Sequence, residues 1–171
     1  QDTLDTSVSF IESIRKIPVR VKECAGFLVN RLLMPYCGEA AYALQEGAAT
    51  AQQMDEAMTA FGMPMGPFLL ADSLGVDICW KVAQILQAAY GDRAKAPEIL
   101  KLLYEKKRFG MKSGAGFYSY SDQPDILSEL VLSKKKTAFS IERIVYPMIN
   151  EAVFCLDEQV AAPSDIDMAM I

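Results

Sequence analysis

Hydrophobic positions along most of the chain recur every three or four residues, which is the period of an α-helix. The clearest apolar stripe follows Phe27 and consists of Leu28, Leu32, Tyr36, Ala40 and Leu44. Apolar neighbours widen this stripe, and Gly47 stands where a glycine commonly ends a helix. The pattern therefore predicts a helix from residue 27 to residue 46 that is buried on most sides.

Further segments also have helical periodicity. They cover residues 1–15, residues 50–62 after a capping Thr50, residues 68–90 with a break near Gly75, and residues 97–107. Between the first two helices, Pro18–Lys22 alternates apolar and polar residues, as a short half-buried strand does. A helix followed by a lone strand is typical of the end of an α/β unit, so we expect the chain to begin inside a larger protein.

The sequence contains an internal repeat. Residues 31–58 align with residues 143–170 at an offset of 112, with ten identities in 28 positions, where ordinary composition gives about two. Both copies carry a proline in the helical pattern, Pro35 and Pro147. Each proline predicts either a kinked helix or a helix that begins nearer the proline. The chain thus holds one helical unit and the opening of a second.

Composition excludes several classes of function. The 171 residues are 51% hydrophobic and 23% charged, as in ordinary globular domains. The net charge of −5 argues against a nucleic-acid or anionic-membrane surface, and no apolar run reaches the ~18 residues that a membrane span needs. The chain has no histidine, so it cannot contain a Ser-His-Asp triad or a His-ligated metal. Its four cysteines form no Cys-x-x-Cys pair, and we expect reduced core thiols rather than a metal site.

Two kinds of polar residue in the helical pattern are candidates for chemistry. Asn30 lies near the start of the long helix, and its counterpart in the second copy is Glu142. The shared scaffold therefore does not require Asn30, which leaves a site-specific role beside a simple hydrogen bond at the helix end. Glu39 and Glu151 are retained in both copies. This repetition favours a structural role over general acid–base catalysis.

A basic, glycine-containing segment runs from residue 106 to residue 116. Its Lys107, Arg108 and Lys112 are candidates for contacting the phosphates of a substrate. The alternative, which we favour, is a solvated helix end followed by a tight turn. The segment is neither a Walker loop nor a dinucleotide fingerprint. A second basic run, Lys134–Lys136, is most simply a soluble connector.

Three spaced motifs together resemble the C-terminal region of the 3-hydroxyacyl-CoA dehydrogenase family. They are Pro18–Arg31, then Gly62–Phe68 with Leu70-Ala71-Asp72 and Gly75-Val76-Asp77, and finally Lys112–Tyr118. Ala25 replaces a common proline of the family and Glu23 a common aspartate. The two consecutive helical copies are similar to the multifunctional β-oxidation enzymes.

The resemblance implies an all-α fold. We expect a helical dehydrogenase C-terminal domain of about five helices, the start of a second homologous repeat, and one short strand left from a missing Rossmann domain. The expected boundaries are residues 1–23 for the tail of the nucleotide-binding domain, 24–121 for the first repeat, 122–139 for a connector and 140–171 for the truncated second repeat. The second repeat should pack on the first as an internal pseudo-dimer.

The resemblance also implies a function, the NAD-dependent oxidation of 3-hydroxyacyl-CoA to 3-ketoacyl-CoA in fatty-acid β-oxidation. Asn30 occupies the position of an asparagine in the family's catalytic polar cluster. The catalytic histidine and the NAD-binding glycines belong to the preceding domain, so this fragment should be inactive alone and bind neither NAD nor a metal.

The expected partners are the acyl-CoA substrate, the missing N-terminal Rossmann domain and a second copy of the chain bound through helical faces, with no nucleic acid. The resemblance favours the bacterial cytoplasm, with the mitochondrial or peroxisomal matrix as alternatives. A non-enzymatic helical assembly module is the competing hypothesis.

Overall fold

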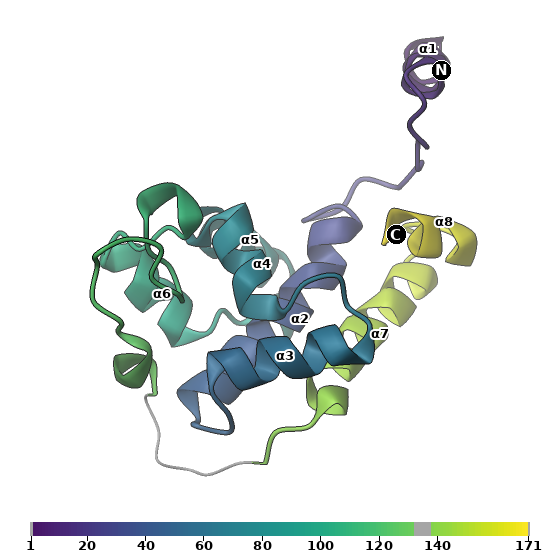
Figure 1. The fold of residues 1–171 in the computed structure, drawn as a ribbon. Coiled ribbons are helices and arrows are strands. Elements are labelled where there is room, and N and C mark those ends of the chain that lie inside the picture. The colour runs from purple at the N-terminus through teal and green to yellow at the C-terminus, as the bar shows by residue number, and fades with distance from the viewer. Residues whose placement is uncertain (1, 132–137, 171) are drawn as a thin grey trace.

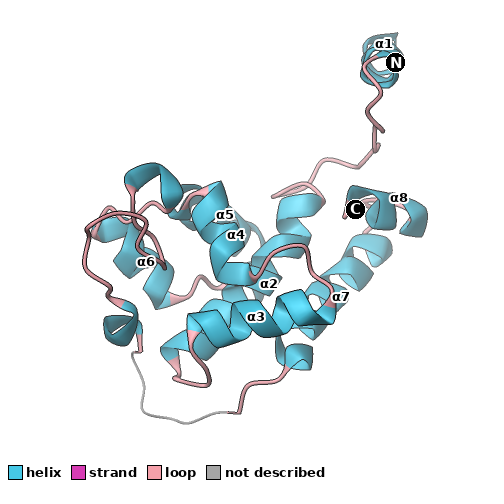
Figure 2. Ribbon diagram, in the orientation of Figure 1, coloured by secondary structure: helices cyan, strands magenta, loops and turns pink. Residues whose placement is uncertain are grey.

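The computed structural model describes residues 2–131 and 138–170, and within these ranges it contains eight α-helices and no β-strand (Figures 1 and 2). The first repeat supplies five helices, as expected: α2 (Val29–Gln45), α3 (Ala51–Phe61), α4 (Pro67–Leu74), α5 (Val76–Tyr90) and α6 (Glu98–Glu105). The others are α1 (Asp2–Ser13), α7 (Ile141–Asp157) and α8 (Pro163–Ala169). The Lys134–Lys136 connector lies outside the described residues.

The predicted ends of the helices have local causes. Thr50 caps α3 through a reciprocal capping box with Gln53, and Gly62 ends that helix with a left-handed φ of 119°. Gly75, with φ of 100°, separates α4 from α5 where the break was predicted. Pro35 and Pro147 both lie inside their helices, so the alternative in which each helix begins near its proline is wrong.

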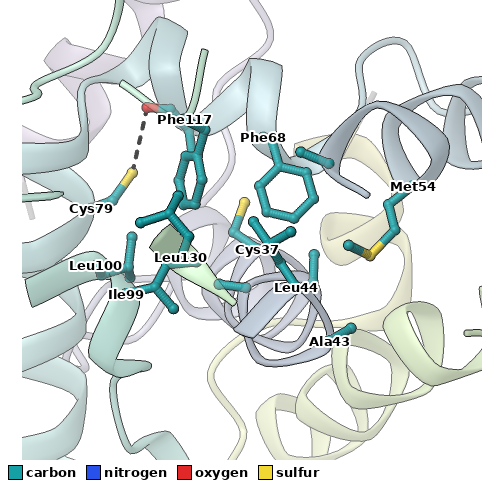
Figure 3. Packing of buried hydrophobic residues seen from close by; sticks show 14 of the residues in the cluster. Cys37, Ala43, Leu44, Met54, Phe68, Cys79, Ile99, Leu100, Phe117 and Leu130 are labelled. Carbon is teal, nitrogen blue, oxygen red and sulfur yellow. Dashed lines mark hydrogen bonds between the residues drawn. The ribbon is translucent and has the colours of Figure 1, made fainter. Parts of the chain in front are cut away.

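Helix α2 is the centre of the fold. It contacts α4, α5 and α6 on one side and α7 on the other, as the expected pseudo-dimer requires. The main core lies beside α2, where the rings of Phe68 and Phe117 meet edge to face with centroids 4.9 Å apart (Figure 3). A smaller core joins the start of α2 to α7 and α8 and consists of Leu28, Leu32, Cys155, Val160 and Ile166. Helices of both repeats therefore pack against α2.

The predicted strand at Pro18–Lys22 is wrong. The segment is extended, but the described residues offer no neighbouring strand, and a strand needs one. The backbone N–H of Lys22 instead donates to the carbonyl of Val160 at 2.8 Å. Val19 and Val21 pack partly buried against the smaller core, which explains the alternating pattern. Before this segment, α1 projects from the body and buries none of its residues (Figure 1).

Two structural features bear on function. No helix in the described ranges combines the length and apolarity that crossing a bilayer requires. Within the same ranges, no group of three or more His, Cys, Asp or Glu residues is placed to hold a metal ion.

The repeat supplies a matched stability test at one helix end. Gly47 follows α2 with φ of 73°, and its counterpart Gln159 follows α7 with φ of 55°. A side chain in this left-handed region costs roughly 1–2 kcal/mol. We expect Gln159→Gly to raise the free energy of unfolding by about 1 kcal/mol and Gly47→Ala to lower it by a similar amount. Urea unfolding measures both changes, and a loss of stability in Gln159→Gly would contradict the account.

Candidate functional site

A tight turn sets the entry into α2. Gly26 has φ of 76°, and a Cβ there would lie 2.8 Å from a methyl carbon of Leu86. The next residue, Phe27, also has a positive φ, of 49°, and its N–H donates to the carbonyl of Cys24. Only glycine fits the Gly26 position, because both the φ angle and the space exclude a side chain. This turn fixes the residues of the first helical turn relative to α5.

Asn30 and Arg31 follow this turn and have opposite environments. Asn30 is exposed on the first turn of α2, whereas the side chain of Arg31 is 1% exposed. Successive helical residues point about 100° apart, so one buried neighbour does not bury the other. The amide of Asn30 is accessible to a molecule outside this chain, while Arg31 fixes the helix that carries it.

Arg31 joins the two repeats through a buried ion cluster. Its Nε donates to Glu151 Oε1 at 2.6 Å, and its terminal nitrogens donate to both carboxylate oxygens of Glu158 at 2.7 and 2.8 Å. The guanidinium carbon also lies 4.4 Å from the ring centre of Tyr90. Burial alone would lower the pKa of Arg31, but the two carboxylates raise it above its usual value. The same contact lowers the pKa of Glu158.

Arg143 makes the equivalent cluster in the opposite direction. Its Nε donates to Glu39 Oε1 at 2.7 Å, and its Nη2 donates to Glu46 Oε2 at 2.9 Å. At the repeat offset of 112, Arg143 corresponds to Arg31, and Glu39 and Glu46 correspond to the two carboxylates that Arg31 binds. Each repeat thus supplies an arginine to the other's glutamates, as in an isologous dimer interface. These contacts support the structural role for Glu39 and Glu151.

The two clusters differ in burial, and Arg93 covers the one around Arg31. The guanidinium of Arg93 lies 4.2 Å from the ring centre of Phe154 and 4.9 Å from that of Tyr90. Its nitrogens are 3.7 Å from Glu151 and 3.9 Å from Glu158. The side chain of Arg143 is 21% exposed, against 1% for Arg31. The Arg31 cluster is therefore the more strongly desolvated of the two.

Sequence reasoning missed two carboxylates that organise the loops of the first repeat, the half-buried Asp55 and the buried Asp72. Asp55 accepts hydrogen bonds from the backbone N–H groups of Phe68 and Leu69 at the start of α4 and from the Tyr118 hydroxyl. Asp72 accepts from the N–H groups of Phe117 and Tyr118 and from the Tyr120 hydroxyl at 2.8–2.9 Å. Burial raises the pKa of both carboxyls, and these donors act in the opposite direction.

The glycines of the family motifs make room for these two carboxylates. A Cβ on Gly66 would lie 2.4 Å from atoms of Asp55, and a Cβ on Gly116 would lie 1.9 Å from Asp72 Oδ1. A Cβ on Gly110 would likewise lie 2.2 Å from the Asp72 carbonyl oxygen. The glycine-rich segment therefore wraps around a carboxylate of its own chain.

The three basic candidates in this segment have different surroundings. Arg108 is buried and donates to the carbonyl oxygens of Gly116 and Pro124 and to the Ser119 hydroxyl. Lys112 forms an ion pair with Asp77 at 2.5 Å. Lys107 is exposed at the end of α6, with φ of 56°. The contacts of Arg108 and Lys112 favour the structural alternative over phosphate binding.

The fold and the paired helical units define the class of the protein. The sequence profile of the 3-hydroxyacyl-CoA dehydrogenase C-terminal domain matches residues 26–120 and 139–171. The chain belongs to this family.

Relatives and solved structures agree with this assignment. The fatty acid oxidation complex subunit alpha of Shewanella amazonensis is 40% identical over 99% of this chain, which spans 26% of that relative's length. The dehydrogenase part of multifunctional enzyme 1 from C. elegans is 28% identical, with a TM-score of 0.71 over 98% of this chain and 40% of that one. The 3-hydroxybutyryl-CoA dehydrogenase of Escherichia coli shares the fold, with 24% identity and a TM-score of 0.82 over 99% of this chain and 54% of that one.

The two clusters provide a matched pair of substitutions. Arg31→Met leaves two carboxylates facing a buried site, and we expect it to lower the free energy of unfolding by about 3–5 kcal/mol. Arg143→Met removes the equivalent residue from a more solvated site, and we expect a loss of about 1 kcal/mol. Urea unfolding of both variants tests this difference. Equal losses would show that burial does not distinguish the clusters.

The Asp72 network provides a second test. In Asp72→Asn, an amide nitrogen replaces an oxygen that accepts from a backbone N–H, so we expect a loss of about 2–3 kcal/mol of stability. Tyr120→Phe removes one hydroxyl donor from the same carboxylate and should cost about 1 kcal/mol. Thermal and urea unfolding compare the two variants, and a larger loss for Tyr120→Phe would refute the assigned role of Asp72.

Proposed function

We propose that the chain is the C-terminal part of an NAD-dependent 3-hydroxyacyl-CoA dehydrogenase of fatty-acid β-oxidation, of the multifunctional type. The observation that carries this proposal is the family match across both helical units, which begins at Gly26 beside the turn that presents Asn30. The relative from Shewanella, whose name refers to fatty acid oxidation, supports the pathway. A bacterial cytoplasmic location is part of the same proposal.

The reaction that we propose converts 3-hydroxyacyl-CoA and NAD⁺ to 3-ketoacyl-CoA, NADH and a proton. NAD, when bound to the complete enzyme, supplies the hydride acceptor. The residues of this chain do not fit that group, because the sequence has no Gly-x-Gly-x-x-Gly fingerprint for the pyrophosphate. It also has no histidine to take the hydroxyl proton. We therefore assign both tasks to a preceding Rossmann domain.

The contribution of this chain is to form one wall of the acyl-CoA cleft. The Asn30 side chain is exposed and can both donate and accept hydrogen bonds. Its backbone is fixed by the Gly26 turn and by the neighbouring Arg31 cluster. A rigid backbone with an accessible amide suits a group that orients the reacting part of a substrate. Lys107 remains a candidate for contacting the phosphates of CoA.

An assembly module is the second candidate function. This function is favoured by exposed apolar side chains on α7, namely Tyr146, Ile149 and Val153. A homodimer formed through helical faces would also favour it. Titration of the chain with an acyl-CoA, combined with its mass in solution, separates the two hypotheses. Acyl-CoA binding supports the dehydrogenase role, whereas self-association without acyl-CoA binding supports the module.

The role of Asn30 can be measured in the complete enzyme. We expect Asn30→Ala to lower kcat about 10²-fold because an orienting hydrogen bond is lost, with little change in melting temperature at this exposed position. Asn150→Ala is a matched control, since Asn150 is also exposed on a helix, α7. Steady-state production of NADH gives the comparison. An unchanged kcat in Asn30→Ala would return this residue to a structural role.

A further inference from the structure

A cavity of about 130 Å³ lies beside α2, and helices α4, α5, α6 and α7 also contribute residues to its lining. Its wall is formed mostly by apolar and small side chains, together with two thiols: Met34, Cys37, Ala71, Cys79, Ala83 and Leu100. Figure 3 shows both thiols close to the Phe68–Phe117 pair of the main core. Charged groups, among them Arg93 and Glu39, border the cavity.

Small residues keep this space open. Gly38 and Ala83 line the cavity from α2 and α5, where larger apolar side chains would fill it. A Cβ built on Gly38 would meet no atom within 4 Å. Protein interiors are close-packed, and an unfilled void of this size reduces stability. A larger residue at either position would remove that penalty, so the retained space suggests an occupant.

The chemistry of the wall selects an apolar occupant. Cys37 Sγ lies 3.8 Å from the carbonyl oxygen of Pro67, and Cys79 Sγ lies 3.9 Å from that of Ala71, so each thiol faces the backbone. Burial raises the pKa of both thiols, that of Cys79 to about 11, which keeps them uncharged. The bordering Glu151 is already paired with Arg31. Most of the lining residues are apolar, and an apolar cavity of about 150 Å³ in another protein stays dry and binds benzene.

We propose that this cavity is a binding site for a short apolar group of about six carbon atoms. The charged residues at its border would leave a polar end of the same molecule in contact with water. The group has two sources that share this chemistry: a free small molecule, or the acyl tail of a CoA thioester. The proposal concerns binding alone and does not depend on the proposed dehydrogenase activity.

The experiment uses hexan-1-ol as the probe and three leucine variants of the chain. Ala83→Leu and Gly38→Leu each place a side chain in the cavity, and Ala88→Leu makes the same change as Ala83→Leu on the exposed face of α5. Calorimetry measures the affinity, and the methyl NMR signal of Met34 reports whether the probe enters the cavity. Gly38→Ala, which adds one carbon into open space, replaces either cavity variant that fails to fold.

We expect hexan-1-ol to bind with Kd on the order of 1 mM, and the cavity variants to weaken it at least about tenfold while Ala88→Leu changes it less than about twofold. A parallel titration compares hexanoyl-CoA with free CoA. If the hexanoyl group strengthens binding and Ala83→Leu abolishes the gain, the occupant is an acyl tail; if it adds nothing, the occupant is a free molecule. Absence of hexan-1-ol binding, or equal binding by all variants, overturns the proposal.

Discussion

The buried guanidinium of Arg31 is the interaction on which the arrangement of the two repeats depends. A charge at 1% exposure is tolerated only when it is paired, and both of its carboxylate partners, Glu151 and Glu158, belong to the second repeat. The position of α7 on α2 is therefore determined by charge pairing as well as by apolar contact. The same helix α2 carries the Gly26 turn at its start and one wall of the cavity along its side. A shift of α7 would disturb both.

The motifs that identify the family explain much of its architecture. Gly66 and Gly116 allow backbone to approach Asp55 and Asp72 at distances that no side chain would permit. The two carboxylates then hold the start of α4 and the segment after residue 116. Asn30 is different, because its exposed side chain contributes nothing comparable to the packing of this chain. This difference supports the role toward a substrate that we propose for Asn30.

Local patterns predicted the helices and their ends well, since apolar spacing, Thr50 and Gly62 act within a few residues. The repeat also contained the signal for the ion clusters, because Arg31 and Glu46 recur as Arg143 and Glu158. Features that depend on contacts between residues distant in the sequence could not be predicted from local patterns. The alternation at Pro18–Lys22 reflects packing on α8 and its vicinity, not a sheet. Asp72 meets Phe117 across 45 residues, a pairing that no local pattern reveals.

The separation between α2 and α7 has a consequence for biosynthesis. The ion pairs that join these helices connect residues 97–127 positions apart. A ribosome that adds ~5–20 residues per second completes α2 roughly 5–25 s before it adds Arg143, Glu151 and Glu158. During that interval the first repeat must fold around α2 with Arg31 facing water. The nascent chain therefore exposes the surface of α2 that α7 later covers. The time needed to synthesise the residues between the two helices sets how long this surface is accessible to chaperones.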